Sequence, residues 1–218
     1  MNKPADTDER DTANNRWRSI IVLVLFAAVV TLAINLVARN TRQEISANQA
    51  AHAMRIVGEV LPTDGYNNEP HLDVIWLSNK ALPGSQSPLP AYRARLDQQV
   101  IATVITTTAE AGYVGPIKLL IGIDSQGRII QVRVSEHRET PGLGDKIEAK
   151  KSDWINLFNG LGQGTEADWT IRQDGGKADH ISGATITSRV VIQTVRAALE
   201  YYLANSAEIN AAPQVLEE

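Results

Sequence analysis

The longest apolar run of the chain covers residues 20–37, "IIVLVLFAAVVTLAINLV". It contains no charged residue, and only Thr31 and Asn35 interrupt it with polar side chains. As a helix that rises about 1.5 Å per residue, this run spans roughly 27 Å, close to the thickness of the hydrocarbon core of a bilayer. The pattern therefore predicts a transmembrane helix over residues 19–38.

The alternative for this run is a cleaved signal peptide. The apolar core of a signal peptide usually has about 7–15 residues and ends in small residues, whereas this run is longer and ends in Leu36-Val37-Ala38. We therefore favour an uncleaved anchor. More basic residues precede the run than follow it, which favours a cytoplasmic tail at residues 1–18. The preceding ones are Lys3, Arg10, Arg16 and Arg18, and those that follow are Arg39, Arg42 and Arg55.

Residues 39–98 connect this anchor to the rest of the chain. An apolar stripe at three- and four-residue steps over residues 41–61 predicts a helix, which Pro62 and the following "TDGYNNEP" end. "LDVIWL" at residues 72–77 predicts a short strand. The composition of "SNKALPGSQSPLP" at residues 78–90 predicts a solvent-facing loop.

Strand patterns dominate after residue 98. "QVIATVITTTA" (99–109) is rich in β-branched residues, and "PIKLLIGID" (116–124) is typical of a half-buried strand. Apolar and polar residues alternate in "RIIQVRVSEH" (128–137), which predicts another strand. The turn sequence "DSQG" (124–127) joins the last two segments, so we expect them to form a β-hairpin.

Two helices are predicted after these strands. "KKSDWINLFNGL" (150–161) predicts a short helix that begins at Ser152 or Asp153, and a longer helix is predicted from about Ser188 to Asn205. We therefore expect an α+β fold, with one N-terminal transmembrane helix followed by a single domain at residues 99–205. That domain combines an antiparallel sheet with flanking helices and precedes a C-terminal tail at residues 206–218.

The composition excludes several kinds of site. The 218 residues carry a formal net charge of −4 at pH 7, which argues against nucleic acid as a partner. The absence of cysteine excludes disulfides, thiolate zinc sites and cysteine-ligated iron–sulfur clusters in this chain. The four histidines are scattered without ligand spacing, so we expect no metal site.

Hydroxyl side chains crowd the segment "DHISGATITSRVV" (179–191), which leads into the last predicted helix. Backbone N–H groups at a helix entry, together with the positive end of the helix dipole, bind anions such as phosphate. Gly183 permits a tight turn there, and Thr185 could present its Oγ1 where a phosphate would sit. The alternative is a helix cap, in which Thr187 or Ser188 accepts hydrogen bonds from the first turn.

Two motifs of the chain resemble those of a known family. Asp179-His180-Ile181-Ser182-Gly183-Ala184-Thr185 matches the Asp-x-x-Ser/Thr-Gly-Ala-Thr signal of proteins that carry FMN as a phosphoester on threonine. His137-Arg138-Glu139-Thr140-Pro141-Gly142-Leu143-Gly144 resembles the His-x-Glu-Thr-Pro-Gly-Leu-Gly loop of the same proteins. With one apolar N-terminal span, the chain is similar to the RnfG family of the Rnf electron transport complexes. That family is related to the NqrC component of the sodium-translocating NADH:quinone oxidoreductase.

The resemblance implies a covalent FMN on Thr185 and no catalytic residue, because Thr185 accepts the flavin and does not act in a turnover cycle. A separate FAD:protein FMN transferase would install the phosphoester, and Asp179 would belong to its recognition signal. Glu139 and Thr140 would hydrogen-bond the polar edge of the flavin, and Leu143 would cover its apolar face. The other expected contacts are Ser182, Gly183, Ala184 and Gly142. Thr187 has a similar reach and is the alternative acceptor.

The function implied by the resemblance is that of an electron carrier in the bacterial inner membrane, with its FMN domain in the periplasm. Its partners would be the other Rnf subunits, RnfA to RnfE, which couple electron transfer between ferredoxin and NAD to the movement of H⁺ or Na⁺. We do not expect the chain to turn over alone. The alternatives are a sensory or regulatory FMN module, an anchored interaction domain without flavin, and a free-standing flavin reductase.

Overall fold

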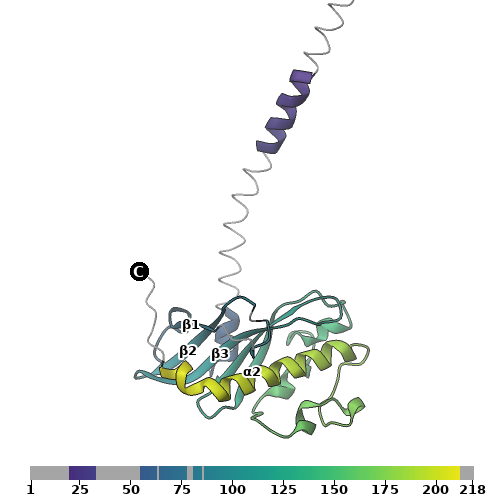
Figure 1. Ribbon diagram of the computed structural model, residues 1–218. Coiled ribbons are helices and arrows are strands. Elements are labelled where there is room, and N and C mark those ends of the chain that lie inside the picture. The colour runs from purple at the N-terminus through teal and green to yellow at the C-terminus, as the bar shows by residue number, and fades with distance from the viewer. Residues whose placement is uncertain (1–19, 33–54, 63, 78–80, 85, 212–218) are drawn as a thin grey trace, which may run out of the picture. The chain divides into compact units, whose positions relative to one another are not determined.

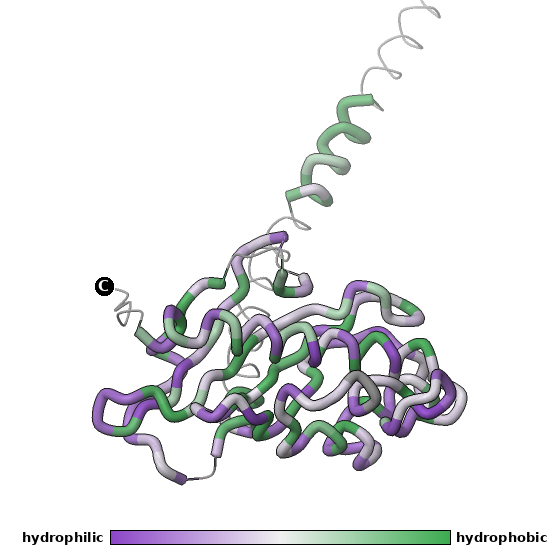
Figure 2. The backbone as a smooth tube through the Cα atoms, turned by 60° about the horizontal axis from the view of Figure 1, so that its bottom comes forward, coloured by the Kyte–Doolittle hydropathy of each residue, from purple (hydrophilic) through white to green (hydrophobic). Residues whose placement is uncertain are grey.

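The computed structural model describes residues 20–32, 55–62, 64–77, 81–84 and 86–211. The chain divides into two compact units, Met1–Ala51 and His52–Glu218. In the first unit, residues 20–32 form a helix whose side chains are exposed and mainly apolar (Figure 2). Among the described residues, no helix is both long and apolar enough to cross a membrane. The helices predicted at residues 19–38 and 41–61 both extend outside the described ranges.

The second unit is built on one antiparallel sheet with the strand order β1-β2-β3-β4-β5 (Figure 1). Each strand pairs with the next one along the chain. The strands are β1 (Val74–Leu77), β2 (Leu89–Leu96), β3 (Gln99–Ala109), β4 (Ile117–Asp124) and β5 (Ile129–Glu136). The predicted α+β class and antiparallel sheet are therefore confirmed.

Helices cover both faces of this sheet. The long helix α2 (Thr185–Ala211) packs on one face, and the short helix at residues 55–60 packs on the other (Figure 1). Neighbouring residues of β3 enter opposite cores, Ile105 beneath α2 and Val104 beneath the short helix. This arrangement follows from the two-residue period of a strand, which turns successive side chains to opposite faces.

The predicted hairpin is present and its turn is held by one carboxylate. Asp124 accepts hydrogen bonds at Oδ1 from the backbone N–H groups of Gln126 and Arg128, each at 2.9 Å. Gly127 has a φ of 75°, a left-handed conformation that glycine adopts without a steric penalty. The "DSQG" sequence therefore supplies both the capping side chain and the residue that the turn requires.

The sequence analysis missed β2. The loop predicted at residues 78–90 ends at Leu89, where β2 begins. Pro90 lies at the second position of the strand, near an end, where a residue without an N–H group is tolerated. Arg93 is fully buried at the centre of β2. A charged residue therefore occupies a core position, and it interrupts the alternation of apolar and polar residues by which a strand is predicted.

The helices differ from the prediction in type and length. The predicted helix at residues 150–161 is a 3-10 helix, η3 (Asp153–Phe158), and Ser152 caps it by accepting a hydrogen bond from the N–H of Trp154. The last helix, α2, begins at Thr185 rather than Ser188 and ends at Ala211 rather than Asn205. The other 3-10 helices described are η1 (Pro70–Leu72), η2 (Gly144–Ile147), η4 (Glu166–Trp169) and η5 (Arg172–Asp174).

A buried ion cluster ties the C-terminal end of α2 to the sheet. The carboxylate of Asp73 pairs with the guanidinium groups of Arg93 and Arg95, and both Asp73 and Arg93 are fully buried. Arg93 also donates from Nη1 to the carbonyl oxygen of Ile209 at 3.0 Å. A buried carboxylate is stable only while its charge is paired and hydrogen-bonded, so Arg93 connects β2, Asp73 and α2.

Arg93→Met should lower the free energy of unfolding by about 3 kcal/mol, because the buried carboxylate of Asp73 loses one of its cationic partners. Urea denaturation followed by circular dichroism measures this loss. Arg128→Met is the matched control, since Arg128 forms an exposed pair with Asp124 and such pairs contribute about 0–1 kcal/mol. Equal losses in the two variants would contradict the role assigned to Arg93.

Candidate functional site

A cavity of about 340 Å³ lies where the loop after β5 meets the start of α2. Most of the predicted flavin contacts line it, together with Thr187, the alternative acceptor, and three residues that were not predicted as flavin contacts. The predicted ones are Glu139, Thr140, Leu143, Gly183, Ala184 and Thr185, and the additional ones are Tyr113, Gly144, Ile186 and Thr187. Ser182, Gly142 and Asp179 lie in the same two segments but do not line the cavity. The fold therefore brings together two motifs that are about 40 residues apart in sequence.

Tyr113 reaches the cavity from the connection between β3 and β4, residues 110–116. The sequence there is "EAGYVGP", and the side chain of Tyr113 is 68% exposed. An exposed aromatic residue between two glycines is a signal for a ligand contact that the sequence analysis did not use. Ile186 and Leu143 are also exposed at the cavity, so three large apolar side chains flank it.

The hydroxyl-rich turn forms the entry of α2. Gly183 has a φ of 80°, and a Cβ at this position would lie 3.0 Å from Cδ2 of Leu143. Both the backbone conformation and the close approach therefore favour glycine. Ser188 fastens the turn, because its Oγ accepts from the N–H of Ile181 at 2.9 Å and donates to the carbonyl of Ala184 at 3.0 Å.

Within the described part of the chain, the backbone N–H groups of Thr185, Ile186 and Thr187 have no recorded acceptor. The first hydrogen bond of the helix runs from the N–H of Ser188 to the carbonyl of Ala184. The three preceding N–H groups point out of the helix end, where the macrodipole places partial positive charge. This end of the cavity is therefore suited to an anion.

The two threonines of the helix entry have different environments. Thr187 is 1% exposed, and its hydroxyl donates to Oε2 of Glu139. Thr185 is half-buried and lines the cavity, and no hydrogen bond within the described residues is recorded for its hydroxyl. Of these two threonines, Thr185 is therefore the one whose hydroxyl is not bonded to another described residue. The alternative of a helix cap at Thr187 or Ser188 is contradicted, because both residues lie inside α2.

Glu139 lies beneath the cavity with both carboxylate oxygens bonded inside the protein. It is 4% exposed, and while Oε2 accepts from Thr187, Oε1 accepts from the N–H of Val114 at 3.0 Å. A Cβ at Gly144 would lie 2.8 Å from Oε2, so a larger residue there would displace the carboxylate. Glu139 thus fixes the position of the first turn of α2 against the loop.

A second hydrogen-bond network, around His137 and Glu148, holds the loop that follows β5. The N–H of Glu139 donates to Nδ1 of His137, and Nε2 of His137 lies 2.8 Å from Oε1 of Glu148. Because Nδ1 accepts, the proton of the neutral ring is on Nε2 and is donated to Glu148. Lys151 also pairs with Glu148, at 2.6 Å. Burial raises the pKa of Glu148, but the hydrogen bonds from Lys151 and His137 outweigh it and leave the pKa lowered.

Asp145 strengthens this network where η2 begins. The hydrogen bond from the N–H of Gly142 is the main cause that lowers the pKa of the Asp145 carboxyl, and Lys151 adds to it from 3.0 Å. The hydrogen bonds of Lys151 with Glu148 and then with Asp145 raise the pKa of Lys151. Gly142 itself has a φ of 81°, a left-handed conformation that glycine adopts without a steric penalty.

Asp179 lies outside the cavity on the approach to α2. Its carboxylate pairs with Nε of Arg172 at 2.8 Å, and both side chains are largely exposed. Its carbonyl accepts from Nε1 of Trp154 at 2.9 Å, which fixes the backbone. The side chain is thus accessible to another protein while the backbone beneath it is held in place.

The chain matches the FMN-binding domain family over residues 112–200, a range that contains both cavity-lining segments and Tyr113. By this match and the geometry of the site, it is a protein with an FMN-binding domain.

Its relatives define the family more narrowly. The G subunit of the ion-translocating oxidoreductase complex from Pseudomonas aeruginosa is 40% identical over 196 residues, covering 89% of this chain and 92% of that protein. Its namesake from Shewanella piezotolerans is 36% identical over 199 residues, covering 90% of this chain and 94% of its own length. The chain belongs to this family of G subunits, the RnfG family, as its motifs predicted.

Among solved structures, the chain is similar to the C subunit of the Na⁺-translocating NADH-quinone reductase from Parabacteroides distasonis. The sequences are 25% identical, the TM-score is 0.41, and the similarity covers 58% of this chain and 64% of that one.

Thr187→Val should lower the free energy of unfolding by about 1–3 kcal/mol, because it removes a donor from the buried carboxylate of Glu139. Thr187→Ser keeps the hydroxyl and should recover most of this loss. Thr185→Val is the matched control and should change stability by less than about 0.5 kcal/mol. Chemical denaturation of the flavin-free protein measures all three variants. A larger loss in Thr185→Val than in Thr187→Val would reverse the assignment of the two hydroxyls.

Proposed function

We propose that the chain is a membrane-anchored electron-transfer subunit that carries FMN as a phosphoester on Thr185. It would serve an ion-translocating oxidoreductase complex that couples electron transfer between ferredoxin and NAD to the movement of H⁺ or Na⁺. The observation that carries the proposal is the cavity, in which one reactive hydroxyl stands at a helix entry with unpaired N–H groups. The relatives in the RnfG family supply the setting of a multi-subunit complex.

The residues of the cavity fit an FMN. The N–H groups of Thr185, Ile186 and Thr187 suit its phosphate, which keeps about one negative charge as a diester. The exposed side chains of Tyr113, Leu143 and Ile186 suit the apolar faces of the ring system. When bound, the isoalloxazine supplies the redox chemistry, while the protein supplies its position and local field.

Thr140 would hydrogen-bond the polar edge of the flavin, because its side chain is exposed at the cavity. Glu139 would act on the flavin indirectly. Its oxygens are engaged by Val114 and Thr187, so it positions the helix entry. Ser182 and Gly142 act through the backbone of their turns rather than as lining residues.

Attachment requires a separate FAD:protein FMN transferase, and Asp179 belongs to the signal that this enzyme reads. The exposure of the Asp179 carboxylate, 70% of its side-chain surface, supports this role. The apolar run at residues 20–37 supports a single membrane span, with the N-terminus in the cytoplasm and the FMN domain in the periplasm. The proposed partners are the Rnf subunits RnfA to RnfE.

Thr185→Val should abolish a flavin adduct that survives denaturation, whereas Thr187→Val should keep it. The full chain is coexpressed with an FMN transferase, and intact mass and in-gel flavin fluorescence measure the adduct. Asp179→Ala should lower the adduct yield, because it alters the recognition signal and leaves Thr185 in place. An adduct lost only in Thr187→Val would move the attachment site. No adduct on the wild-type chain, with the transferase active on another substrate, would refute the covalent link.

The topology can be tested with single cysteines, because the chain contains none. In spheroplasts, a membrane-impermeant maleimide should label Gln126→Cys, which lies exposed in the β4–β5 turn, and should label Asp6→Cys only after lysis. Mass-tag gels give the labelled fraction. The reverse pattern would place the FMN domain in the cytoplasm, and labelling of both positions before lysis would contradict an N-terminus inside the cell.

A further inference from the structure

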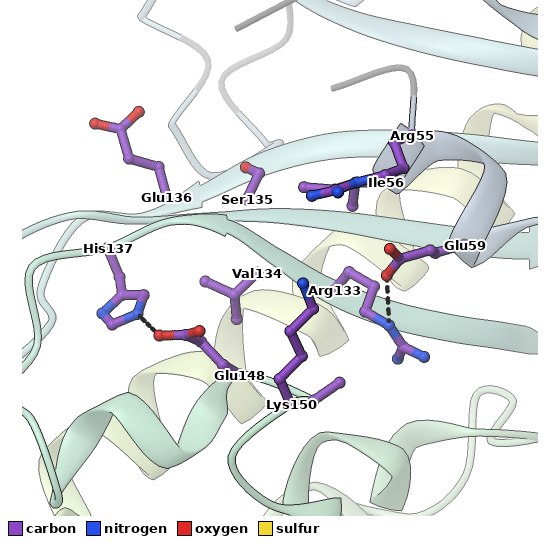
Figure 3. A pocket seen from close by; sticks show the side chains of 11 residues that line it. Arg55, Ile56, Glu59, Arg133, Val134, Ser135, Glu136, His137, Glu148 and Lys150 are labelled. Carbon is purple, nitrogen blue, oxygen red and sulfur yellow. Dashed lines mark hydrogen bonds and ion pairs between the residues drawn. The ribbon is translucent and has the colours of Figure 1, made fainter. Parts of the chain in front are cut away.

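A second cavity, of about 380 Å³, lies between the short helix at residues 55–60, the end of β5 and the segment after η2 (Figure 3). We call it the basic groove. Its lining contains three cationic side chains, Arg55, Arg133 and Lys150, with the apolar residues Ile56, Val134 and Ala149 between them. It shares no lining residue with the first cavity, which lies between the loop after β5 and the start of α2.

The acidic residues of the groove are already neutralised. Glu148 pairs with Lys151 at 2.6 Å and with His137, Glu136 pairs with Lys118 at 2.7 Å, and Glu59 lies 3.4 Å from Arg133. Each carboxylate therefore has its own cationic or hydrogen-bonding partner, and two of those partners, Lys118 and Lys151, are outside the lining. The carboxylates do not cancel the remaining cations of the groove.

Arg55 and Lys150 are these remaining cations. No ion pair or hydrogen bond with a described residue is recorded for either side chain, and their charged ends point into the same space (Figure 3). Arg133 is the third cation, but it is already engaged, because its buried Nε lies 3.4 Å from Oε2 of Glu59 and its Nη1 donates to the carbonyl of Val132 at 2.8 Å. The cations available to a ligand are therefore Arg55 and Lys150.

We propose that the basic groove binds a phosphate group, as a monoester or a diester. Two uncompensated positive charges match the charge of about −1.5 to −2 that a phosphate monoester carries near neutral pH. A guanidinium group and an ammonium group that converge on one space are the donors typical of phosphate sites. The apolar lining suits the carbon skeleton to which such a phosphate is attached.

The phosphate has two possible sources, a phospholipid headgroup or a small phosphorylated solute. Arg55 belongs to the first helix described after the apolar run at residues 20–37, and it lies 17 positions after residue 38, the end of the predicted span. The closeness of the predicted span in sequence makes a phospholipid headgroup one of the two sources to be tested. The shared chemistry is the phosphate group, and the experiment distinguishes the two sources.

The test compares phosphate binding by the full chain in detergent, produced without the FMN transferase, with that of Arg55→Gln/Lys150→Gln. Titration calorimetry measures the affinity for inorganic phosphate, which represents a small phosphorylated solute. Native mass spectrometry after incubation with phosphatidylglycerol measures the binding of a phospholipid. At least one of the two probes should bind the wild-type chain, and the double variant should bind it at least about tenfold more weakly. If the wild-type chain binds phosphatidylglycerol but binds inorganic phosphate only weakly, the source is a lipid headgroup. If it binds inorganic phosphate but not phosphatidylglycerol, the source is a small solute.

The matched control is Arg128→Gln/Lys177→Gln, which removes the same charge from exposed ion pairs outside the groove. It should leave the affinity within about twofold of the wild type, and Lys150→Arg should do the same because it keeps the cation. The proposal is overturned if neither probe binds the wild-type chain, or if the control loses as much affinity as the groove variant. The substituted residues do not line the cavity at the start of α2, so the proposed attachment of flavin to Thr185 should be equal in all these variants when they are coexpressed with the transferase.

Discussion

The buried carboxylate of Glu139 is the constraint on which the candidate site depends. It joins three segments that are distant in sequence, since it accepts from Val114 in the β3–β4 connection and from Thr187 in α2, while its own backbone belongs to the loop after β5. A carboxyl group with 4% exposure requires such partners, because burying a polar group without hydrogen bonds is strongly unfavourable. The hydrogen bonds that satisfy Glu139 therefore also hold the first turn of α2 against the loop and shape the cavity.

Helix α2 is fastened by buried polar side chains near both ends. Glu139 holds its first turn through Thr187, and Arg93 holds its last turn through the carbonyl oxygen of Ile209. Between these points its inner side packs on the sheet, with residues such as Val195 fully buried. A helix fixed at both ends presents Thr185 and the unpaired N–H groups in one geometry, which suits a cofactor bound through its phosphate.

The parts of the structure that were predictable from sequence are those that depend on local chemistry. β3 was found by its β-branched residues, and the hairpin was found by a turn whose aspartate and glycine act within five residues of one another. β2 was missed because Arg93 occupies a core position. A buried arginine is explained by its pairing with Asp73, a contact that the sequence pattern does not reveal. The start of α2 was misplaced because Thr187 bonds to a residue 48 positions away rather than to its own helix entry.

The motif residues His137 and Glu139 form one structural unit, which explains their spacing in physical terms. The ring of His137 accepts the N–H of the residue two positions later, so the side chain closes a tight turn that the backbone alone leaves open. This bond aims Glu139 inward at Thr187 while His137 faces Glu148 in the basic groove. The turn thus forms a wall of each cavity. A hydrogen-bonded connection between them runs from Glu148 through the imidazole ring of His137 to the backbone of Glu139, so the geometry of the candidate site is set partly by residues that do not line it.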